Sequence, residues 1–218
     1  MGRVGWLAAG WLALVLPVVA LALTSLPYTP QAGRTFRAAQ STGGSENLAV
    51  GALLVSKPDL EDPNFLHTVV VLVQYSEDKG AFGLIINRRT DQTLAKVLPD
   101  VKTAGTHLVY EGGPVQTDMM LALFRSHAKP DEGQRVAGDV YETADSGSIQ
   151  KIAGAVTPDR FHAYVGYCGW GEGQLENEVG LGAWAVLAPD SRVLFDDDPD
   201  SLWQRLDRKS QIRIAQVR

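Results

Sequence analysis

The sequence predicts an α+β domain in which a mixed, mainly antiparallel sheet is flanked by a few helices. Short runs rich in Val, Ile and Leu recur along the chain and are joined by tight turns, which is typical of antiparallel pairing. Helical patterns are few and do not alternate regularly with the strands, as they would in a parallel α/β protein. With 218 residues, 45% of them hydrophobic, the chain is long enough for one domain and an additional segment.

Apolar runs of strand length follow one another from Leu48 onward. They are residues 48–55, 67–75, 81–87, 106–110, 119–124, 136–141, 161–167 and 183–188. The segment 76–80 between the second and third runs has the composition of a hairpin turn. The run at 136–141 lies in a polar stretch, 126–143, that we otherwise interpret as loop. We expect residues 193–195 to pair with the last run.

Helical signals occur at three places. Arg89-Thr90-Asp91 has the composition of a helix start, and Pro99 ends the apolar pattern that follows it. A second helix is predicted over residues 173–181. Asp198-Pro199 combines an N-cap acid with proline at the first helical position and predicts a C-terminal helix. Its buried face consists of Leu202, Trp203 and Leu206. Residues 148–155 fit a short helix or a strand.

The first 26 residues differ in kind from the rest. From Val4 to Leu26 the chain carries no charge and is long enough to cross a bilayer as a helix. We expect a transmembrane anchor, on a side that the sequence leaves undetermined. A signal segment cleaved near Ala20-Leu21-Ala22 would instead make the protein exported, and a downstream start would make it cytoplasmic. Residues 27–47, rich in Pro, Gly, Ser and Thr, are predicted to be a flexible linker before a domain at 48–218.

Charge and cysteine content exclude several classes of function. The formal net charge is −5, and since Arg3 is the only charged residue before Arg34, residues 34–218 carry −6. Such a domain lacks the broad basic surface that nucleic-acid binding needs, so direct DNA binding is disfavoured. Cys168 is the single cysteine, which rules out an intramolecular disulfide and a multi-cysteine zinc site.

The densest glycine pattern, Gly169-x-Gly171-x-Gly173, stands between a predicted strand and a predicted helix. Such a turn can direct backbone N–H groups at a phosphate or another anion. Its spacing differs from the dinucleotide fingerprint, and Glu172 and Glu176 place negative charge where an anion would bind. We therefore favour a tight strand-to-helix junction over an anion site.

No set of side chains predicts a catalytic centre. Cys168 needs a base, and His162, six residues earlier on the same predicted strand, would lie roughly 20 Å away at the usual strand rise. We interpret Cys168 as a buried thiol. Residues 196–198 form an acidic cluster that fits helix capping, and Glu176 and Glu178 point to different faces of a helix. The sequence thus predicts no catalytic residue, no metal site and no cofactor.

Polar residues and turns at strand ends form one candidate ligand-binding set. Asn87 and Arg88 follow a strand in an otherwise acidic chain, Gly113 lies in a Gly-Gly-Pro turn, and Gln174 opens a predicted helix. Loops at the ends of strands of one sheet can meet. We expect these four residues to border a groove for a polar or acidic ligand, with solvated strand-end charges as the alternative.

Four motifs in order carry a family resemblance. They are Lys57-Pro58-Asp59-Leu60-x-Asp62-Pro63-x-Phe65-x-x-Thr68-Val69, Gly83-Leu84-Ile85-Ile86-Asn87-Arg88, Gly112-Gly113-Pro114-Val115, and Gly166-Tyr167-x-Gly169-Trp170-x-x-Gly173-Gln174-Leu175-Glu176-x-Glu178 with Gly182-Ala183-Trp184. Together they resemble the YqgE/AlgH family of bacterial proteins over residues 48–207. The resemblance implies a sheet curled toward a pseudo-barrel, with helices outside, in a small cytosolic protein of unassigned activity. One branch of that family is described as a regulator of alginate gene expression. The apolar N-terminal segment and Cys168, where a small residue such as Ala is expected, depart from the family pattern.

Two functions from different classes remain in view. The first is a non-enzymatic regulatory or binding protein that acts through a protein partner and is held at the membrane by residues 4–26. The second is an enzyme or a nucleotide or anion binder that uses the strand-end loops and the turn from Gly169 to Gly173. We favour the first because no catalytic set accompanies the motifs.

Overall fold

The computed structural model describes residues 47–102 and 104–217, with side chains as far as residue 212. The expected anchor over residues 4–26 and all but the last residue of the expected linker lie outside this part. Within the described residues, no helix combines the length and the apolar character needed to span a membrane.

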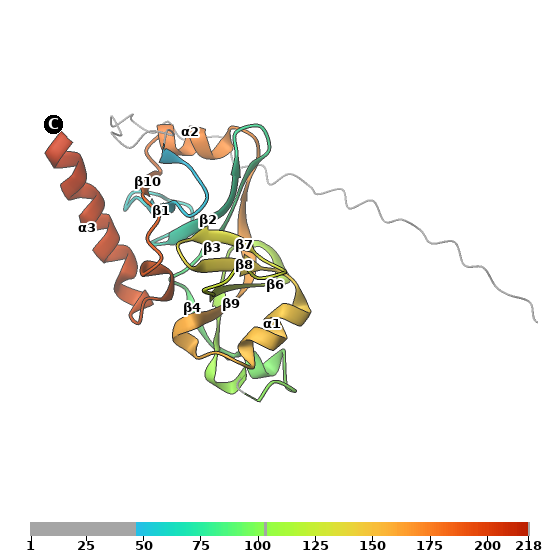
Figure 1. Cartoon of the computed structure of the whole chain (residues 1–218). Helices are drawn as coiled ribbons and strands as arrows, with labels where there is room; N and C mark the ends of the chain where they lie inside the picture. The colour runs from blue at the N-terminus through green and yellow to red at the C-terminus, as the bar shows by residue number, and fades with distance from the viewer. Residues whose placement is uncertain (1–46, 103, 218) are drawn as a thin grey trace, which may run out of the picture. The chain divides into compact units, whose positions relative to one another are not determined.

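A ten-stranded, mainly antiparallel sheet forms the centre of the domain (Figure 1). Its strands are β1 Leu53–Ser56, β2 Val69–Ser76, β3 Gly80–Ile85, β4 Arg89–Thr93, β5 Leu108–Glu111, β6 Val115–Arg125, β7 Gln134–Ala137, β8 Val140–Thr143, β9 Phe161–Trp170 and β10 Trp184–Leu187. The main path runs β10-β1-β2-β3-β9-β6-β8-β7, while β4 pairs with β5. The pairing of β5 with β9 is parallel and the other pairs are antiparallel. The α+β expectation is confirmed.

The sheet curls until β7 lies against β2, but no backbone ladder between described strands closes it. A side chain bridges the gap instead, since Gln134 Nε2 on β7 donates to the Val73 carbonyl oxygen on β2 at 3.0 Å. We call this junction between β2 and β7 the seam. The pseudo-barrel implied by the family resemblance is therefore an open, curled sheet.

Three helices cover this sheet within the described residues: α1 Ser146–Ala153, α2 Gln174–Gly180 and α3 Pro199–Val217. Helix α3 packs on β1 and β10, α2 contacts β10 and β3, and α1 contacts β6 (Figure 1). The Trp203 indole fixes α3 to the sheet by donating from Nε1 to the Ser56 carbonyl oxygen at 2.8 Å. The helix predicted from Asp198-Pro199 is confirmed.

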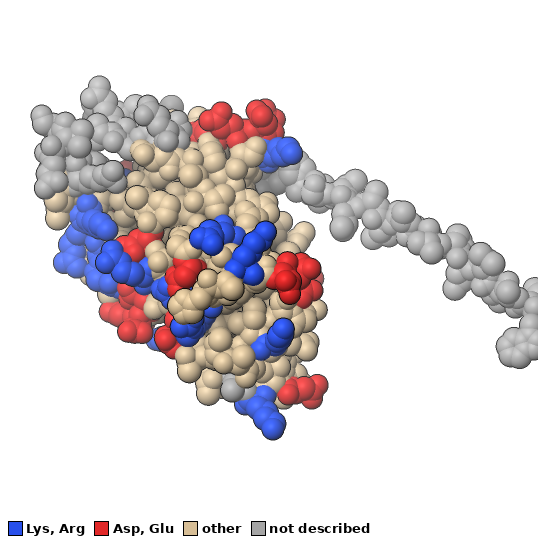
Figure 2. Space-filling view, viewed as in Figure 1, with Lys and Arg blue, Asp and Glu red and all other residues tan. Residues whose placement is uncertain are grey.

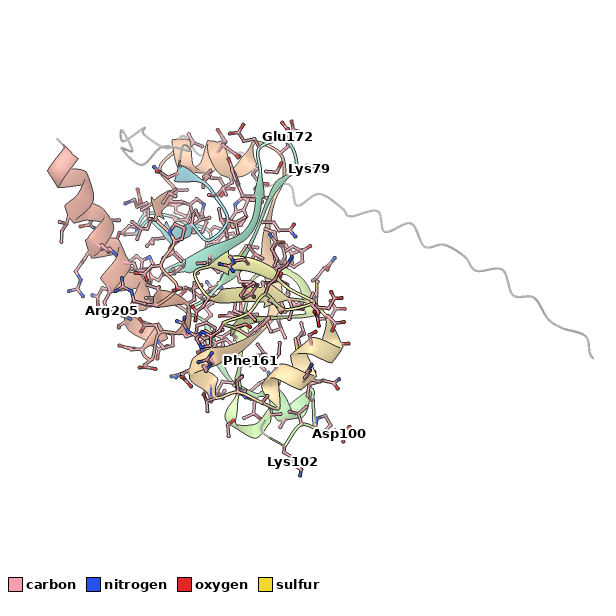
Figure 3. All side chains as sticks on the ribbon, in the orientation of Figure 1. Lys79, Asp100, Lys102, Phe161, Glu172 and Arg205 are labelled. Carbon is pink, nitrogen blue, oxygen red and sulfur yellow. The ribbon has the colours of Figure 1, made fainter. Side chains whose placement is uncertain are left out.

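Buried side chains form clusters on both faces of the sheet. Val71 and Val73 of β2 face the inside of the curl, whereas Val70 and Leu72 belong to a second cluster beneath α2. A third cluster lies beneath α1 and contains Phe161 of β9, which is labelled in Figure 3. Because β2 is covered on both faces, its sequence is an unbroken apolar run rather than an alternating one.

Three local predictions are corrected by the structure. Residues 89–93 form strand β4 rather than a helix start, because Thr90 Oγ1 donates to the Val109 carbonyl oxygen of β5 at 2.7 Å; only a 3-10 turn, Leu94–Lys96, follows. Residues 193–195 are a 3-10 turn, and β1 is the pairing partner of β10. The polar stretch 126–143 contains the hairpin β7–β8, which turns at Gly138 with a φ of 55°.

Residues 148–155 belong to α1. The Asp145 side chain accepts the Ser148 backbone N–H at 2.7 Å and caps the first turn, which settles the choice between helix and strand.

Candidate functional site

An open groove of about 510 Å³ lies where the inner face of the curled sheet reaches the β7–β8 hairpin. Six strands or their flanking loops contribute to its walls. The lining residues are Gln74, Phe82, Gln116, Met119, Leu121, Glu132, Gly133, Gln134, Glu142, Thr143, Ala144, Asp145 and Tyr167. A volume in this range is typical of sites for small molecules.

Irregularities in two strands shape the groove. The register of β2 with β3 shifts between Leu72 and Gln74, and that of β6 with β9 shifts between Val115 and Met120. Bulges of this kind redirect side chains and occur often beside functional sites. Within the second irregularity Gln116 adopts a φ of 45°, a conformation that side-chain-bearing residues rarely take. Both irregular segments contribute a glutamine to the groove wall.

Glu142 is the most unusual side chain in the groove. It stands on β8 between Leu123 of β6 and Gln134 of β7 and is only 8% exposed. Among the described residues, no group donates a hydrogen bond to its carboxyl group or forms an ion pair with it. Burial raises the pKa of Glu142 from 4.5 to about 7, because removal from water penalises the charged form.

Aromatic and apolar side chains form another part of the groove wall. The Phe82 and Tyr167 rings pack against each other with centroids 4.6 Å apart, and Met119 packs on the same inner cluster. Their faces offer contact area for an alkyl chain or a planar group of a ligand. Gln74 and Gln116 add amides that can both donate and accept hydrogen bonds.

The charged residues that line the groove are all acidic. Glu132 and Asp145 lie at the rim, and no Lys, Arg or His is among the lining residues. The Ser148 backbone N–H bonded to Asp145 holds the pKa of that carboxyl below its usual range, so Asp145 stays ionised at neutral pH. The groove therefore favours neutral or cationic ligands over anions.

The residues predicted from the sequence to bind a ligand make structural contacts elsewhere. Asn87 is buried, where its Oδ1 accepts from Val69 N at 2.8 Å and its Nδ2 donates to the His67 carbonyl oxygen at 2.9 Å. Arg88 forms an ion pair with Glu111 at 3.2 Å. These contacts fix the end of β3 against neighbouring segments.

Gly113 and Gln174 also have structural partners. A Cβ added to Gly113 would lie 2.2 Å from the Tyr167 carbonyl carbon, so the close approach of two backbones requires glycine. Gln174 accepts the Gly171 backbone N–H at 3.1 Å and donates to Glu178 at 3.0 Å. None of the four residues lines the groove, and their joint role in ligand binding stays a prediction.

The fourth motif is organised by one carboxylate. Glu178 Oε2 accepts from Trp170 Nε1 at 3.0 Å and from Trp184 Nε1 at 2.9 Å, while its Oε1 accepts from Gln174 Nε2. We call Glu178, Gln174, Trp170 and Trp184 the Glu178 cluster. It joins the end of β9, helix α2 and the start of β10, which accounts for the spacing of the motif.

The glycine-rich turn is packed against a hairpin. Gly80, in the β2–β3 hairpin, lies so close to Trp170 and Gly171 that an added Cβ would meet the Trp170 carbonyl oxygen at 2.1 Å. Figure 3 shows the neighbouring Lys79 and Glu172 at the same end of the molecule. The Gly171 N–H is already bonded to Gln174, and α2 has only seven residues. These contacts support the junction interpretation over an anion site.

Cys168 is a buried thiol, as predicted. It is 0% exposed and donates to the Gly112 carbonyl oxygen at 3.4 Å, and burial raises its pKa well above the usual range. Cys168 belongs to the cluster beneath α2, whereas the His162 ring stacks on Tyr110 of the inner cluster with ring centroids 4.4 Å apart. Among residues 47–102 and 104–217, no three His, Cys, Asp or Glu side chains are grouped to hold a metal ion.

Sequence reasoning missed Glu142 because it interpreted residues 126–143 mostly as loop. The usable signal is the strand Val140-Tyr141-Glu142-Thr143, whose successive side chains point to opposite faces of the sheet. Glu142 is on the same face as Val140, so a carboxylate takes a position that an inward apolar residue would normally hold. The other groove residues are dispersed from Gln74 to Tyr167, and no local pattern joins them.

Comparison with known proteins places the chain in a family. A family model described as AlgH-like matches residues 53–215. The chain is 37% identical over 157 residues to a UPF0301 protein from Thioalkalivibrio sulfidiphilus, covering 69% of this chain and 83% of the relative. It is 35% identical over 184 residues to a UPF0301 protein from Thermobifida fusca, covering 77% and 89%.

Two solved structures share the fold. The solution structure of the AlgH protein from Pseudomonas aeruginosa superposes with a TM-score of 0.60 at 33% identity, covering 74% of this chain and 86% of AlgH. A crystal structure of a protein from Corynebacterium diphtheriae superposes with a TM-score of 0.63 at 22% identity, covering 74% and 87%, and supports the fold alone. The family expected from the four motifs is thereby confirmed: the chain belongs to the AlgH-like family of UPF0301 proteins.

Proposed function

We propose that the protein is a non-enzymatic binding protein with a regulatory role. In this proposal the groove takes a small polar ligand, and its occupancy controls association with a protein partner. The observation that carries the proposal is the Glu142 carboxyl group, which is buried at the groove without a described partner. Polar groups of buried residues are normally hydrogen-bonded, and this carboxyl group opens into the groove, where a ligand can supply the donor.

The chemistry of the wall supports binding rather than covalent catalysis. Three glutamines, two aromatic rings and one methionine are among the lining residues, and Thr143 is engaged because its Oγ1 accepts the Asp145 N–H at 3.1 Å. A single carboxyl group with a raised pKa can move a proton, but covalent catalysis also needs an activated nucleophile. Capture of a ligand needs only the cavity and its polar groups.

The surface supports a protein partner over DNA. Residues 34–218 carry a net charge of −6, and Figure 2 shows lysine and arginine interspersed with aspartate and glutamate on the face in view. Such a surface gives little of the phosphate attraction that dominates DNA affinity. Regulation through a protein partner fits this charge distribution better.

A variant that fills the groove tests the proposal. Ala144 is an exposed lining residue, so Ala144→Trp introduces a large ring at the groove without replacing a core side chain. Ala128→Trp, at an exposed position away from the groove lining, is the matched control. Full-length wild type and both variants are screened by thermal shift against amines, amides, nucleosides and carboxylic acids. We expect a compound class that stabilises wild type and the control but not Ala144→Trp.

The regulatory part is tested with the compound so identified. Tagged wild-type protein is used to capture partners from native cytosol and membranes with and without the compound. We expect the recovered partner to change with the compound for wild type and not for Ala144→Trp. Equal stabilisation of wild type and Ala144→Trp by every active compound would disprove binding in the groove.

A further inference from the structure

We infer that the groove recognises a cationic nitrogen group, a guanidinium or a primary ammonium, with the Glu142 carboxylate as its ion-pair partner. This inference rests on the proposed binding function and names the chemical class of the ligand. Three features of the groove carry it: the carboxyl group without a described partner, the negative surroundings and the aromatic wall.

The carboxyl group itself calls for a positive partner. A carboxylate moved out of water loses hydration that several hydrogen bonds or an opposite charge must replace. The described residues around Glu142 provide neither, and burial is the cause of its raised pKa. A ligand cation would complete the site, because charged hydrogen bonds to a carboxylate are shorter and stronger than neutral ones.

The surroundings on every side agree with a cation. Leu123 of β6 and Gln134 of β7 stand opposite Glu142, and the groove lining adds Glu132 before β7, Met119 from β6, Tyr167 from β9 and Asp145 from the start of α1. The two carboxylates of this group stand at the rim, and the lining contains no basic side chain that would compete with the ligand. An anion would face three carboxyl groups without a compensating charge.

The aromatic wall suits the remainder of such a ligand. A guanidinium or ammonium group over the face of Phe82 or Tyr167 gains cation–π attraction, and a short alkyl chain gains contact with Met119. The amides of Gln74 and Gln116 can accept further N–H groups. A guanidinium has an advantage over an ammonium, because its planar N–H pair matches the two oxygens of a carboxylate.

Binding of a cation changes the protonation of Glu142. The neutral acid dominates below pH 7, and a cation favours the carboxylate, so the acid must release a proton as the ligand binds. Apparent affinity therefore rises about tenfold per pH unit below pH 7 and levels off above it. A ligand that binds through neutral hydrogen bonds to the protonated acid would show the opposite trend.

The experiment compares matched small probes on the full-length protein. Binding of n-butylguanidinium, n-butylammonium, n-butanol and butyrate is measured by NMR titration at pH 8, for wild type, Glu142→Gln and Glu111→Gln. Glu111 is an exposed carboxylate outside the groove, so its variant controls for net charge. We expect both cations to bind wild type and Glu111→Gln, and at least tenfold weaker binding to Glu142→Gln.

A pH series keeps the test valid if Glu142→Gln folds poorly. Wild-type affinity for n-butylguanidinium is measured at pH 6, 7 and 8, and we expect an increase that levels off above pH 7. Nα-acetyl-L-arginine N-methylamide is added as a peptide-like probe. Tighter binding of this probe than of n-butylguanidinium would indicate an arginine side chain of a partner, and weaker binding would indicate a small free cation; both agree with the inference.

Other results overturn the cation inference without overturning the proposed binding function. Binding of n-butanol or butyrate as tight as that of the cations removes the cation preference, as does equal cation binding by wild type and Glu142→Gln. The absence of binding by both cations at millimolar concentration also overturns the inference. The groove itself is judged by the Ala144→Trp screen, which covers neutral and acidic compounds.

Discussion

Glu178 and Glu142 are two partly or fully buried glutamates in opposite situations. Glu178 accepts hydrogen bonds from two indoles and one amide, so its charge is matched by donors from three segments. Glu142 faces a groove without a described donor, and burial raises its pKa to about 7. The comparison teaches that the most recognisable motif of this chain maintains the fold, whereas the groove holds a carboxyl group without a donor among the described residues.

The largest expected effect concerns Gly166, which belongs to the same motif as Glu178. It has a φ of 69°, and an added Cβ would meet the Gly113 carbonyl oxygen at 2.3 Å. We expect Gly166→Ala to lower the free energy of unfolding by about 4 kcal/mol, because backbone strain adds to a steric clash. Chemical denaturation measures the loss. The control Gly180→Ala, in open space on α2, is expected to stabilise by about 0.5 kcal/mol.

Glu178→Ala is expected to lower the free energy of unfolding by about 3 kcal/mol. The substitution leaves two indole N–H groups and one amide without their acceptor, and unsatisfied buried donors cost about 1–3 kcal/mol each. Urea denaturation of Glu178→Ala and of the exposed Glu172→Ala provides the comparison. A loss of less than 1 kcal/mol would contradict the structural role of the cluster.

Glu142→Gln is expected to change stability in the opposite direction. Because the folded-state pKa is raised from 4.5 to about 7, the folded protein binds the proton more tightly, and stability falls as pH rises through this window. The amide has no such cost, so the variant is expected to be more stable than wild type by about 2 kcal/mol at pH 8 and nearly equal at pH 4. Thermal or urea unfolding across this range measures the difference. A Glu142→Gln variant less stable than wild type at pH 8 would show that the carboxylate has a partner.

The smallest expected effect concerns the seam beside the groove. Gln134→Ala removes the hydrogen bond to the Val73 carbonyl oxygen and is expected to lower the free energy of unfolding by about 1 kcal/mol. Amide hydrogen exchange in β7 is expected to accelerate, while exchange around the Glu178 cluster stays unchanged. Gln150→Ala on the exposed face of α1 serves as control. Equal acceleration of hydrogen exchange in β7 and around the Glu178 cluster would mean that the seam stabilises the whole domain.

The parts of the fold that could be predicted from sequence are those with local signals. Strands β2, β3 and β9 are long apolar runs, and the Asp198-Pro199 pair identifies the start of α3. Strand β4 is not predicted because its residues are polar and its extended form depends on pairing with β5, where Val109 lies 19 residues after its partner Thr90. Tertiary pairing decided the structure where local preference was weak.

The groove was harder to predict than the fold for the same reason. Its lining comes from segments between Gln74 and Tyr167 that meet only after the sheet curls. Asn87, by contrast, looked functional in the sequence because it is a polar residue after a strand, but its amide bonds to the backbone at Val69 and His67. A polar residue at a strand end can bind a ligand or hold the backbone in place, and its hydrogen-bond partners distinguish the two roles.

The Glu178 cluster also gives the protein an internal optical reporter. Trp170 and Trp184 pack edge to face with centroids 6.1 Å apart, and both indoles donate to the same carboxylate. Their emission depends on the polarity and hydrogen bonding of the indole ring. Release of α2 from the sheet would therefore alter the fluorescence of both tryptophans at once, so that the residues which identify the family also allow its unfolding to be followed without a label.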